Sequence, residues 1–426
     1  MSRSLPDEVD VAVIGAGAAG IAAGRRLAEA GVATVVLEAR DRVGGRAWTV
    51  VDRAPHPLDM GCAWLHSAGR NPWTAIAEAA GFAIDRSDPA WGTQAGGTLF
   101  APGEIEAYRA DLDGFFARLA EAAAAPGPDR PASDLVDPDA RWTPLIEAIN
   151  SYINGTSLAE TSIRDFDAYE DTEENWRLPA GYGTLVAAHA EGLPIVTGCP
   201  VVRVDHSGPR IRLETPRGIV RCRTAIVTVP TPVLASGQLA FYPALADHRD
   251  AAAGLPLGVA DKVFLSILEP DALPAGHVFG AKDRAGTGSY HLRRFDWPMV
   301  EAYFGGPFAR DLERAGPDAA AAFALDELAG LFGADIRKVL KPVAVTAWAQ
   351  DVHAGGSYSI ALPGHAGDRA RLAAPAAGGR LFFAGEATHT SAYSTAHGAY
   401  LSGRRAAEEA LAAIGRQNGR PSGDGA

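Results

Sequence analysis

The chain lacks the cysteine pairs and the long apolar runs that mark several classes of protein. It has only three cysteines, Cys62, Cys199 and Cys222, and no C-x-x-C pair, so we expect neither a disulfide framework nor a metal site. Apolar stretches such as 9–14 and 225–229 are broken by glycine or proline long before they reach the length of a membrane-spanning helix. The sequence therefore predicts no membrane anchor.

Basic residues are also in the minority. The chain has 39 Lys and Arg against 51 Asp and Glu, a formal net charge of −12. Such a charge opposes nucleic-acid binding and favours cationic ligands, although solubility alone would also explain it. A strand pattern begins at Val9 and leaves no room for a charged and apolar signal segment before it, so we expect a cytoplasmic location.

What is present is typical of a globular enzyme of more than one domain. The 426 residues are 47% hydrophobic and 21% charged. A chain of this length can bury two cores, so we expect two domains that each bury their own apolar residues.

The N-terminal segment has the pattern of a strand, a glycine turn, a helix and a second strand. The letters are DVAVIGAGAAG, then IAAGRRLAEAG, then TVVLEAR. Gly15, Gly17 and Gly20 form G-x-G-x-x-G between the first strand and the helix, where missing side chains permit a tight turn and a close approach to a pyrophosphate. The segment predicts a dinucleotide-binding βαβ unit.

The next two features narrow the choice of dinucleotide. Glu38 ends the second strand, where a carboxylate accepts hydrogen bonds from a ribose and repels a 2′-phosphate, so FAD or NAD remain. The segment Arg42–Arg46 holds the glycine pair Gly44 and Gly45 between two arginines, which could approach a second set of cofactor oxygens. By itself, this segment could also be a turn with solvated arginines.

Four segments together resemble the flavin-containing amine oxidase family. They are VAVIGAGAAGIAAGRRLAEAG, VLEARDRVGGRAWT, DMGCAWLH and LFFAGEATHTSAYSTAHGAYLSG, in the family order. The letters WLH before Asn71 and Pro72, and YSTAHGAYLSG, are most similar to polyamine oxidases such as spermine oxidase. The resemblance implies an α/β fold, in which a Rossmann-like FAD-binding domain is interleaved with an α+β substrate-binding domain.

The resemblance also implies domain limits and a bound cofactor. We expect the FAD-binding domain at 1–82, 179–243 and 350–418, the substrate-binding domain at 83–178 and 244–349, and a flexible tail at 419–426. FAD should be noncovalent, because Ser357 stands where monoamine oxidases carry the cysteine that bonds to flavin. The residues assigned to FAD are Gly15, Gly17, Ala18, Gly20, Glu38, Ala39, Arg40, Gly44, Gly45, Arg46, Gly61, Cys62, Ala63, Trp64, Val202, Gly385, Glu386, Thr395 and Ala396.

Two of these assignments depend on the resemblance alone. Val202 would hold the adenine region, and Glu386 would contact the ribityl or phosphate part of FAD. Without the family, Val202 reads as sheet core and Glu386 as a capped turn residue.

Five residues are candidates for the amine site. Lys262 matches the family lysine that holds a water near flavin N5, although a lysine at a strand edge would read the same. Trp348 and Tyr358 match the tryptophan beside the flavin and the aromatic wall that guides the amine, with ordinary aromatic core as the alternative. Thr395 stands where monoamine oxidases have a second tyrosine, which leaves one aromatic wall. His66 matches a channel histidine of animal polyamine oxidases, or is a plain surface histidine.

An acidic stretch follows in the expected substrate-binding domain. It could attract cationic substrates as an anionic funnel or be a solvated loop. Its members are Asp165, Asp167, Glu170, Asp171, Glu173 and Glu174.

The resemblance implies the reaction of an FAD-dependent amine oxidase. A hydride would pass from the carbon next to the amine nitrogen to flavin N5, O2 would be reduced to H2O2, and the imine would be hydrolysed. We expect a polyamine or related amine as substrate, and a monomer or homodimer. Alternatives are an L-amino-acid oxidase or desaturase of the same fold, the former needing a carboxylate-binding arginine such as Arg293 or Arg294, or an FAD-bearing, demethylase-like module that binds a protein tail.

Overall fold

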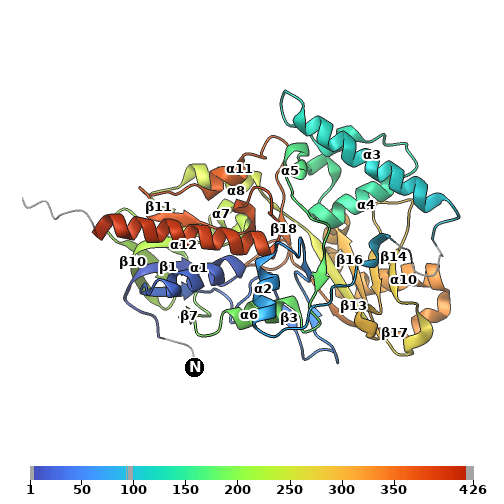
Figure 1. Ribbon diagram of the computed structural model, residues 1–426, viewed down its shortest axis with the longest axis horizontal. Coiled ribbons are helices and arrows are strands. Elements are labelled where there is room, and N and C mark those ends of the chain that lie inside the picture. Colours follow the sequence, from blue (N-terminus) through green and yellow to red (C-terminus); the bar gives the residue numbers. More distant parts are fainter. Residues whose placement is uncertain (1–3, 93, 95–98, 419–426) are drawn as a thin grey trace, which may run out of the picture.

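The computed structural model describes residues 4–92, 94 and 99–418, and it divides into two sheets with their own helices (Figure 1). The tail expected at 419–426 lies outside the described residues. In Figure 1 the long helix α12 crosses one half of the molecule, while α3 and α10 belong to the other half. The expected α/β fold is confirmed.

The first sheet has eight strands in the order β11-β8-β9-β10-β1-β2-β7, with β19 beside β10. The strands β1, β2, β7, β10 and β19 pair in parallel, whereas β9 is antiparallel to both β8 and β10. Their bounds are β1 Glu8–Ile14, β2 Thr34–Leu37, β7 Ile195–Val196, β8 Arg203–Asp205, β9 Ile211–Thr215, β10 Gly218–Val227, β11 Ala240–Tyr242 and β19 Leu381–Phe383.

Strand β1 shows why this sheet lies in the middle of its domain. Its last four residues are all apolar and buried, as expected for a parallel strand covered on both faces. Val11 and Val13 pack in one apolar cluster, while Ala12 and Ile14 pack in another, because successive side chains point to opposite faces. Helices therefore cover both faces of the sheet.

Small residues bring two helices together on one of these faces. Helix α1 (Ala18–Glu29) lies beside α12 (Ala396–Asn418). A Cβ atom on Gly403 would lie 2.1 Å from Ala19 O, so this crossing requires glycine. The other helices of this half are α2 Pro72–Ala79, α6 Tyr182–His189, α7 Thr231–Ala235, α8 Ala246–Gly254 and α11 Asp368–Ala373.

The second sheet is antiparallel, in the order β14-β15-β16-β13-β17. One face packs its apolar residues against helices α9 and α10, and the other face is turned toward a cavity. The bounds are β13 Ala260–Ile267, β14 Gly276–Phe279, β15 Ser289–Leu292, β16 Met299–Gly305, β17 Leu340–Val345, α9 Gly306–Ala315 and α10 Pro317–Phe332.

Three further helices close the cavity from the opposite side. They are α3 Glu104–Ala124, α4 Thr143–Asn154 and α5 Ile163–Asp167, and they share a small apolar core with Phe279 of β14. Short strand pairs join the parts: β3 Thr49–Val50 with β4 Leu58–Asp59, β5 Trp64–Leu65 with β6 Trp176–Arg177, and β12 Leu257–Gly258 with β18 Tyr358–Ser359.

The strands of the two sheets come from different parts of the chain. The first sheet draws on segments within 8–37, 195–242 and 381–383, and the second on segments within 260–345. The domain limits themselves stay a prediction. The predicted substrate-binding segment 244–349 includes three residues that pack in the core of the first sheet, Ala251, Ala252 and Leu255.

The described residues form neither a membrane-spanning helix nor a metal-binding cluster. No helix among residues 4–418, as far as they are described, has an apolar stretch long enough to cross a bilayer. In the same residues, no cluster of three or more His, Cys, Asp or Glu side chains is arranged to hold a metal ion.

Candidate active site

One large cavity of about 940 Å³ joins the two halves of the molecule. Its volume is at the upper end of the range for ligand sites, about 300–1,000 Å³. It begins at the N-terminus of α1 and the end of β2, and it continues to the open face of the second sheet and to helices α3 and α4. We call the first part the nucleotide half and the second part the amine half.

The three glycines of the turn have three different tasks. Gly15 has a φ of +106°, which disfavours any residue with a side chain. A Cβ on Gly20 would lie 1.9 Å from Gly15 O, so Gly20 permits the close packing of helix on turn, and it does not line the cavity. Gly17 lines the cavity, and a Cβ there would meet its nearest atoms only at 3.9 Å, which leaves open space before the helix N-terminus.

Backbone amides hold Glu38 in place at the edge of the cavity. Its Oε2 accepts a hydrogen bond from Ala16 N–H at 2.6 Å, and its Oε1 accepts one from Arg40 N–H at 2.9 Å. Each carboxylate oxygen has capacity for a second hydrogen bond. The buried Glu38 therefore presents a fixed acceptor to the cavity, as a ribose hydroxyl requires.

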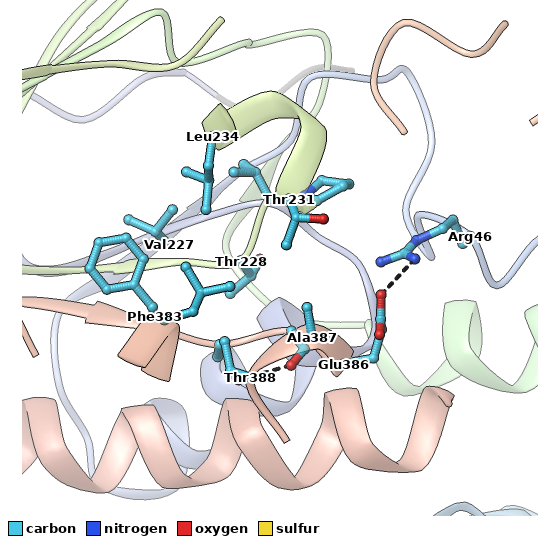
Figure 2. Close-up of a pocket in the computed structure, with 14 residues that line it drawn as sticks. Arg46, Val227, Thr228, Thr231, Leu234, Phe383, Glu386, Ala387 and Thr388 are labelled. Atoms are coloured by element: carbon cyan, nitrogen blue, oxygen red, sulfur yellow. Dashed lines mark hydrogen bonds and ion pairs between the residues drawn. The ribbon is translucent and has the colours of Figure 1, made fainter. Parts of the chain in front are cut away.

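The arginines near the glycine pair are mostly neutralised within the protein. Arg46 Nη1 lies 2.8 Å from Glu386 Oε1 and also donates to Ser357 O, as Figure 2 shows for the pair with Glu386. Arg40 pairs with Asp351 at 2.8 Å. Arg40 and Arg46 line the cavity, whereas Arg42 stacks over Trp48 and donates to Gly45 O.

Glu386 is the centre of a buried polar network. It accepts hydrogen bonds from the Ser359 hydroxyl at 2.5 Å and from Ser394 N–H at 2.8 Å. Burial alone would raise the pKa of Glu386, but the charge of Arg46 and the Ser359 hydrogen bond lower it overall. Beside this network lies a small cavity of about 20 Å³ (Figure 2), about the room needed by one water.

One assignment in the nucleotide half is wrong by one position. The Val202 side chain is 46% exposed, and Val202 does not line the cavity. Its N–H donates to Glu214 O and its C=O accepts from Ala240 N–H, so both backbone groups are used in the sheet. Val201 and Pro200 line the cavity instead.

The segment after β4 runs along the middle of the cavity. Gly61 is required there, because its Cβ would lie 1.7 Å from Arg46 O. Burial, reinforced by the nearby Asp59 carboxylate, raises the pKa of the Cys62 thiol to about 12, so Cys62 stays a thiol. Gly61, Cys62, Ala63 and Trp64 all line the cavity.

Lys262 is a buried ion-paired residue and not a surface lysine. It is 5% exposed, and its Nζ lies 2.8 Å from both Glu301 Oε1 and Asp59 O. Glu301 also accepts a hydrogen bond from Arg177 Nη1 at 2.9 Å. Burial would raise the pKa of Glu301, but Arg177 and Lys262 hold it far below its ordinary value. Glu301 is therefore shared by two cationic side chains, and the buried Asp59 carboxyl lies close enough to interact with both of them.

Tyr358 lines the amine half as part of a tyrosine cluster. Its hydroxyl lies 3.0 Å from the Tyr303 hydroxyl and donates to Tyr152 O at 2.5 Å. Burial and the adjacent Tyr303 raise the pKa of Tyr358 well above its ordinary value, so it remains a neutral phenol. Trp348 also lines the cavity, and its buried ring is fixed by a hydrogen bond that Nε1 donates to Met60 O at 2.9 Å.

Thr395 and His66 line the cavity from the side of α12 and of the loop before α2. The Thr395 hydroxyl donates to Ala392 O and accepts from Gly398 N–H, so it caps α12 and has no proton left for a substrate. The adjacent Ala396 places the helix N-terminus, with its partial positive charge, at the cavity. His66 Nδ1 lies 2.5 Å from Asn175 Oδ1, and burial lowers the pKa of His66, which favours a neutral ring.

The acidic stretch divides into a buried and an exposed part. Asp165 is 5% exposed and pairs with Arg369 through two hydrogen bonds of 2.6 and 2.7 Å, so it belongs to no funnel. Asp167, Asp171 and Glu173 are exposed and line the cavity. We call these three the acidic mouth.

A comparison with protein-family models gives the affiliation of the chain. The model described as "Flavin containing amine oxidoreductase" matches residues 18–121 and 133–411. The chain belongs to this family. It is therefore an FAD-dependent amine oxidoreductase, as the resemblance in the sequence predicted.

Relatives in the family include oxidases and demethylases. The chain is 28% identical to Polyamine oxidase 2 of Arabidopsis thaliana, covering 94% of this chain and 87% of the relative. It is 29% identical to Lysine-specific histone demethylase 1 homolog 1 of the same plant, covering 94% of this chain. The chain spans about half the length of that demethylase, 52%.

Solved structures with the same fold include two enzymes that are named as oxidases of small amines. Cyclohexylamine oxidase from Brevibacterium oxydans IH-35A has a TM-score of 0.76 and 22% identity, covering 97% of this chain and 100% of that one. Wild-type putrescine oxidase bound to putrescine has a TM-score of 0.75 and 20% identity, covering 96% of this chain and 100% of that one.

The shape and the polar groups of the cavity in this flavin amine oxidoreductase are suited to bind FAD. The open space before α1, the fixed Glu38 carboxylate and the glycine contacts at Gly61 form a continuous cradle. With the exception of Gly20 and Val202, every residue that the sequence assigned to FAD or to the amine site lines this cavity.

Several lining residues were missed by reasoning from sequence. Alternate positions of β15 and β16 face the cavity, and the polar residues among them were a usable signal, because a polar side chain in an apolar strand needs a partner. The missed residues are Tyr152, His277, Ser289, His291, Glu301 and Tyr303, together with the supporting Arg177.

The arginines that an amino-acid oxidase would need lie elsewhere. Arg294 pairs with Asp85 at 3.1 Å, and Arg293 lies 3.7 Å from Asp271. Neither lines the cavity, and among the described lining residues the arginines are Arg40 and Arg46, which are ion-paired. A substrate carboxylate would find no free guanidinium here.

Proposed function

We propose that this protein is an amine oxidase that uses O2 as the electron acceptor and releases H2O2. The observation that carries the proposal is the continuity of the cavity, in which the cradle for FAD opens onto the buried Lys262 and the Tyr358 wall. When bound, FAD would supply the redox chemistry, namely acceptance of a hydride from the carbon next to the amine nitrogen and transfer of the electrons to O2, and water would hydrolyse the imine.

The amine half favours the neutral amine that this reaction needs. A free alkylamine has a pKa of about 10, like lysine, and enters as a cation. Lys262 and Arg177 are already paired with Glu301, so this half offers an entering ammonium group no free carboxylate from that cluster. Desolvation lowers the pKa of an amine in this half, which favours release of a proton before oxidation.

The position of Lys262 Nζ is fixed by its hydrogen bonds, and we propose that Lys262 acts close to the reacting atoms. Its three N–H donors are directed by two acceptors, Glu301 and Asp59 O, and one donor remains for a water in the cavity. Tyr358 and Trp348 complete the apolar wall that excludes other water.

FAD is held noncovalently in this proposal. Ser357 donates its hydroxyl hydrogen bond to Ala260 O and offers no thiolate. Cys62, the cysteine in the described cavity lining, has a pKa raised to about 12 and is a poor nucleophile. The free cysteines support a reducing, cytoplasmic location. We retain a monomer or homodimer as the expected assembly.

The substrate class is a cationic amine that enters through the acidic mouth. Asp167, Asp171 and Glu173 would raise its local concentration. Similarity to a polyamine oxidase makes polyamines candidates, as the sequence suggested.

The test uses purified protein loaded with FAD. Amines should bleach the flavin without O2 and yield H2O2 with O2, and acid denaturation should release free FAD. Lys262→Met, which leaves Glu301 paired with Arg177, should slow amine oxidation, whereas Lys341→Met on the exposed edge of β17 should not. Protein that takes up no FAD, or FAD that no amine reduces, would refute the proposal.

A further inference from the structure

The open face of the second sheet carries a polar cluster that the reaction does not use. Alternate residues of four neighbouring strands point into the cavity, while the residues between them pack against α9 and α10. We call Trp91, His277, Ser289 and His291 the histidine subsite. From the lysine outward, the polar residues on this face are Lys262, Glu301, Tyr303, Ser289, His291 and His277.

Hydrogen bonds assign the proton of His277. Gln94 Oε1 accepts from Phe279 N–H at 2.9 Å, which fixes the amide, so Gln94 Nε2 donates to His277 Nδ1 at 3.1 Å. His277 then carries its proton on Nε2 and donates it to Ser289 Oγ at 2.7 Å. The Ser289 hydroxyl is thereby left as a donor, and the 7% exposed serine lines the cavity.

The same argument assigns the proton of His291. Trp91 Nε1–H donates to His291 Nε2 at 3.3 Å, so a neutral ring carries its proton on Nδ1. His291 is 8% exposed and lines the cavity. Within residues 4–92, 94 and 99–418, no acceptor is found for His291 Nδ1–H or for the Ser289 hydroxyl. Two buried donors are therefore available to a ligand.

The subsite is uncharged, and the neighbouring charges on this face are already paired with one another. Burial lowers the pKa of His277 to about 3 and the pKa of His291 well below its ordinary value. The nearest carboxylate on this face, Glu301, is already paired with Lys262 and Arg177. A second ammonium group at this place would be buried without a counter-charge, which is strongly unfavourable.

We propose that the histidine subsite binds an uncharged hydrogen-bond acceptor, such as an ether or amide oxygen, at the far end of the amine substrate. The inference rests on the proposed amine oxidation and narrows its substrate class. A bare polyamine, with an ammonium at this end, is a poor occupant.

Strand geometry sets the length of the preferred substrate. Ser289 and His291 lie on β15, two strands from the Lys262 strand β13. Strands are about 4.8 Å apart, so the subsite is roughly 10 Å from Lys262. An extended chain covers ~10 Å in about eight to nine bonds.

The experiment compares three amines of equal length with the FAD-loaded full chain. They are nonylamine, a methoxyheptylamine with its ether at the far end, and diaminooctane with amines at both ends. We expect kcat/KM for the ether to exceed that for nonylamine by about fivefold, as one hydrogen bond allows. We expect the diamine to fall below nonylamine by at least about tenfold.

Two variants and one control locate the effect. Ser289→Ala and His291→Phe should each reduce the ether-to-nonylamine ratio toward one. Ser266→Ala, on β13 but outside the cavity lining, should keep the wild-type ratio.

The outcomes separate this inference from the function beneath it. If none of the three amines reduces the flavin, the proposed oxidation fails. If all three are oxidised but the ether has no advantage, or the diamine is preferred, the oxidation stands and the histidine subsite is refuted. An ether advantage that survives both variants would also overturn it.

Discussion

Two buried carboxylates, Glu38 and Glu301, show how differently the two halves of the cavity are built. Glu38 is held by two uncharged backbone N–H groups, one from Ala16 in the glycine turn and one from Arg40, two residues after it. Glu301 is held by two side-chain cations from strands far away in the sequence, Lys262 and Arg177. The Glu38 carboxylate of the nucleotide half is thus fixed by backbone, and the Glu301 carboxylate of the amine half by charged side chains.

The difference predicts how each half fails. Where glycines pack against backbone, as at Gly20 and Gly61, an added Cβ atom would clash with a main-chain oxygen that cannot move aside. In a network of charged side chains, the loss of one charge leaves the opposite charge buried without a partner. Four variants test this contrast, from the largest expected effect to the smallest.

Glu301→Gln should have the largest effect on stability. The change keeps the shape but removes the carboxylate that Lys262 and Arg177 share, and loss of one partner from a buried ion pair costs about 3–5 kcal/mol of unfolding free energy. Denaturant unfolding of the FAD-loaded protein measures it. Exposed Glu191→Gln is the control and should change stability by less than about 0.5 kcal/mol. Equal stability of the two variants would show that the amine half does not depend on charge pairing.

Gly20→Ala tests the backbone half with a single methyl group. Its Cβ would lie 1.9 Å from Gly15 O, so the turn or the helix must shift, at a cost of roughly 2–3 kcal/mol. We expect loss of FAD retention on gel filtration together with a lower Tm. Gly330→Ala in α10 meets no atom within 4 Å and should stabilise the protein by about 0.5–1 kcal/mol. A Gly20→Ala protein that keeps FAD would contradict the rigid cradle.

A third buried carboxyl group, Asp261, extends the comparison, because it is stabilised by a proton that it shares with Glu313 and not by a cation. Burial and the neighbouring Glu313 raise the pKa of Asp261 to about 8. In the unfolded chain this pKa is about 4, so the folded state binds more protons between about pH 4 and pH 8, and stability falls as pH rises through this window.

Asp261→Asn should remove that pH dependence. The amide can donate to Glu313 at every pH, while its oxygen still accepts from Thr346 and Trp348. Between about pH 6 and pH 8, the wild type should lose on the order of 2 kcal/mol relative to the variant. Parallel slopes of unfolding free energy against pH would refute the shared proton.

The acidic mouth should give the smallest effect, because its charges are exposed. Replacing Asp167 by Asn and Glu173 by Gln should lower kcat/KM for a cationic amine about two- to fivefold at low salt and leave kcat unchanged. The difference should vanish at high salt. Glu191→Gln with Glu269→Gln, both outside the cavity lining, is the matched control. A loss that persists at high salt would place these residues in direct binding instead.

Much of the nucleotide half could be predicted from sequence. Gly15, Gly17 and Glu38 belong to one continuous segment, so their spacing alone specifies the turn and the carboxylate that follows it. The limit is visible at Val202, whose assignment depended on the resemblance alone, because the neighbouring Val201 lines the cavity and Val202 does not. A shift of one residue reverses the direction of a side chain.

The amine half was predicted only in part. Lys262 and Tyr358 could be placed through family resemblance, but nothing in the letters said which acidic residue would neutralise the lysine. Asp165 illustrates the same limit. It stands in an acidic run that reads as a solvated loop, yet its partner Arg369 lies 204 positions away and takes it into the core.

By itself, the sequence determined the α/β fold, the family and the cradle for FAD, because these depend on local backbone geometry and on residues close together in the chain. Only the tertiary structure decided the charge and the hydrogen-bonding character of the amine half. Those properties arise where strands distant in sequence place Lys262, Glu301, Arg177 and His291 side by side, and whether a buried group is charged depends on such neighbours.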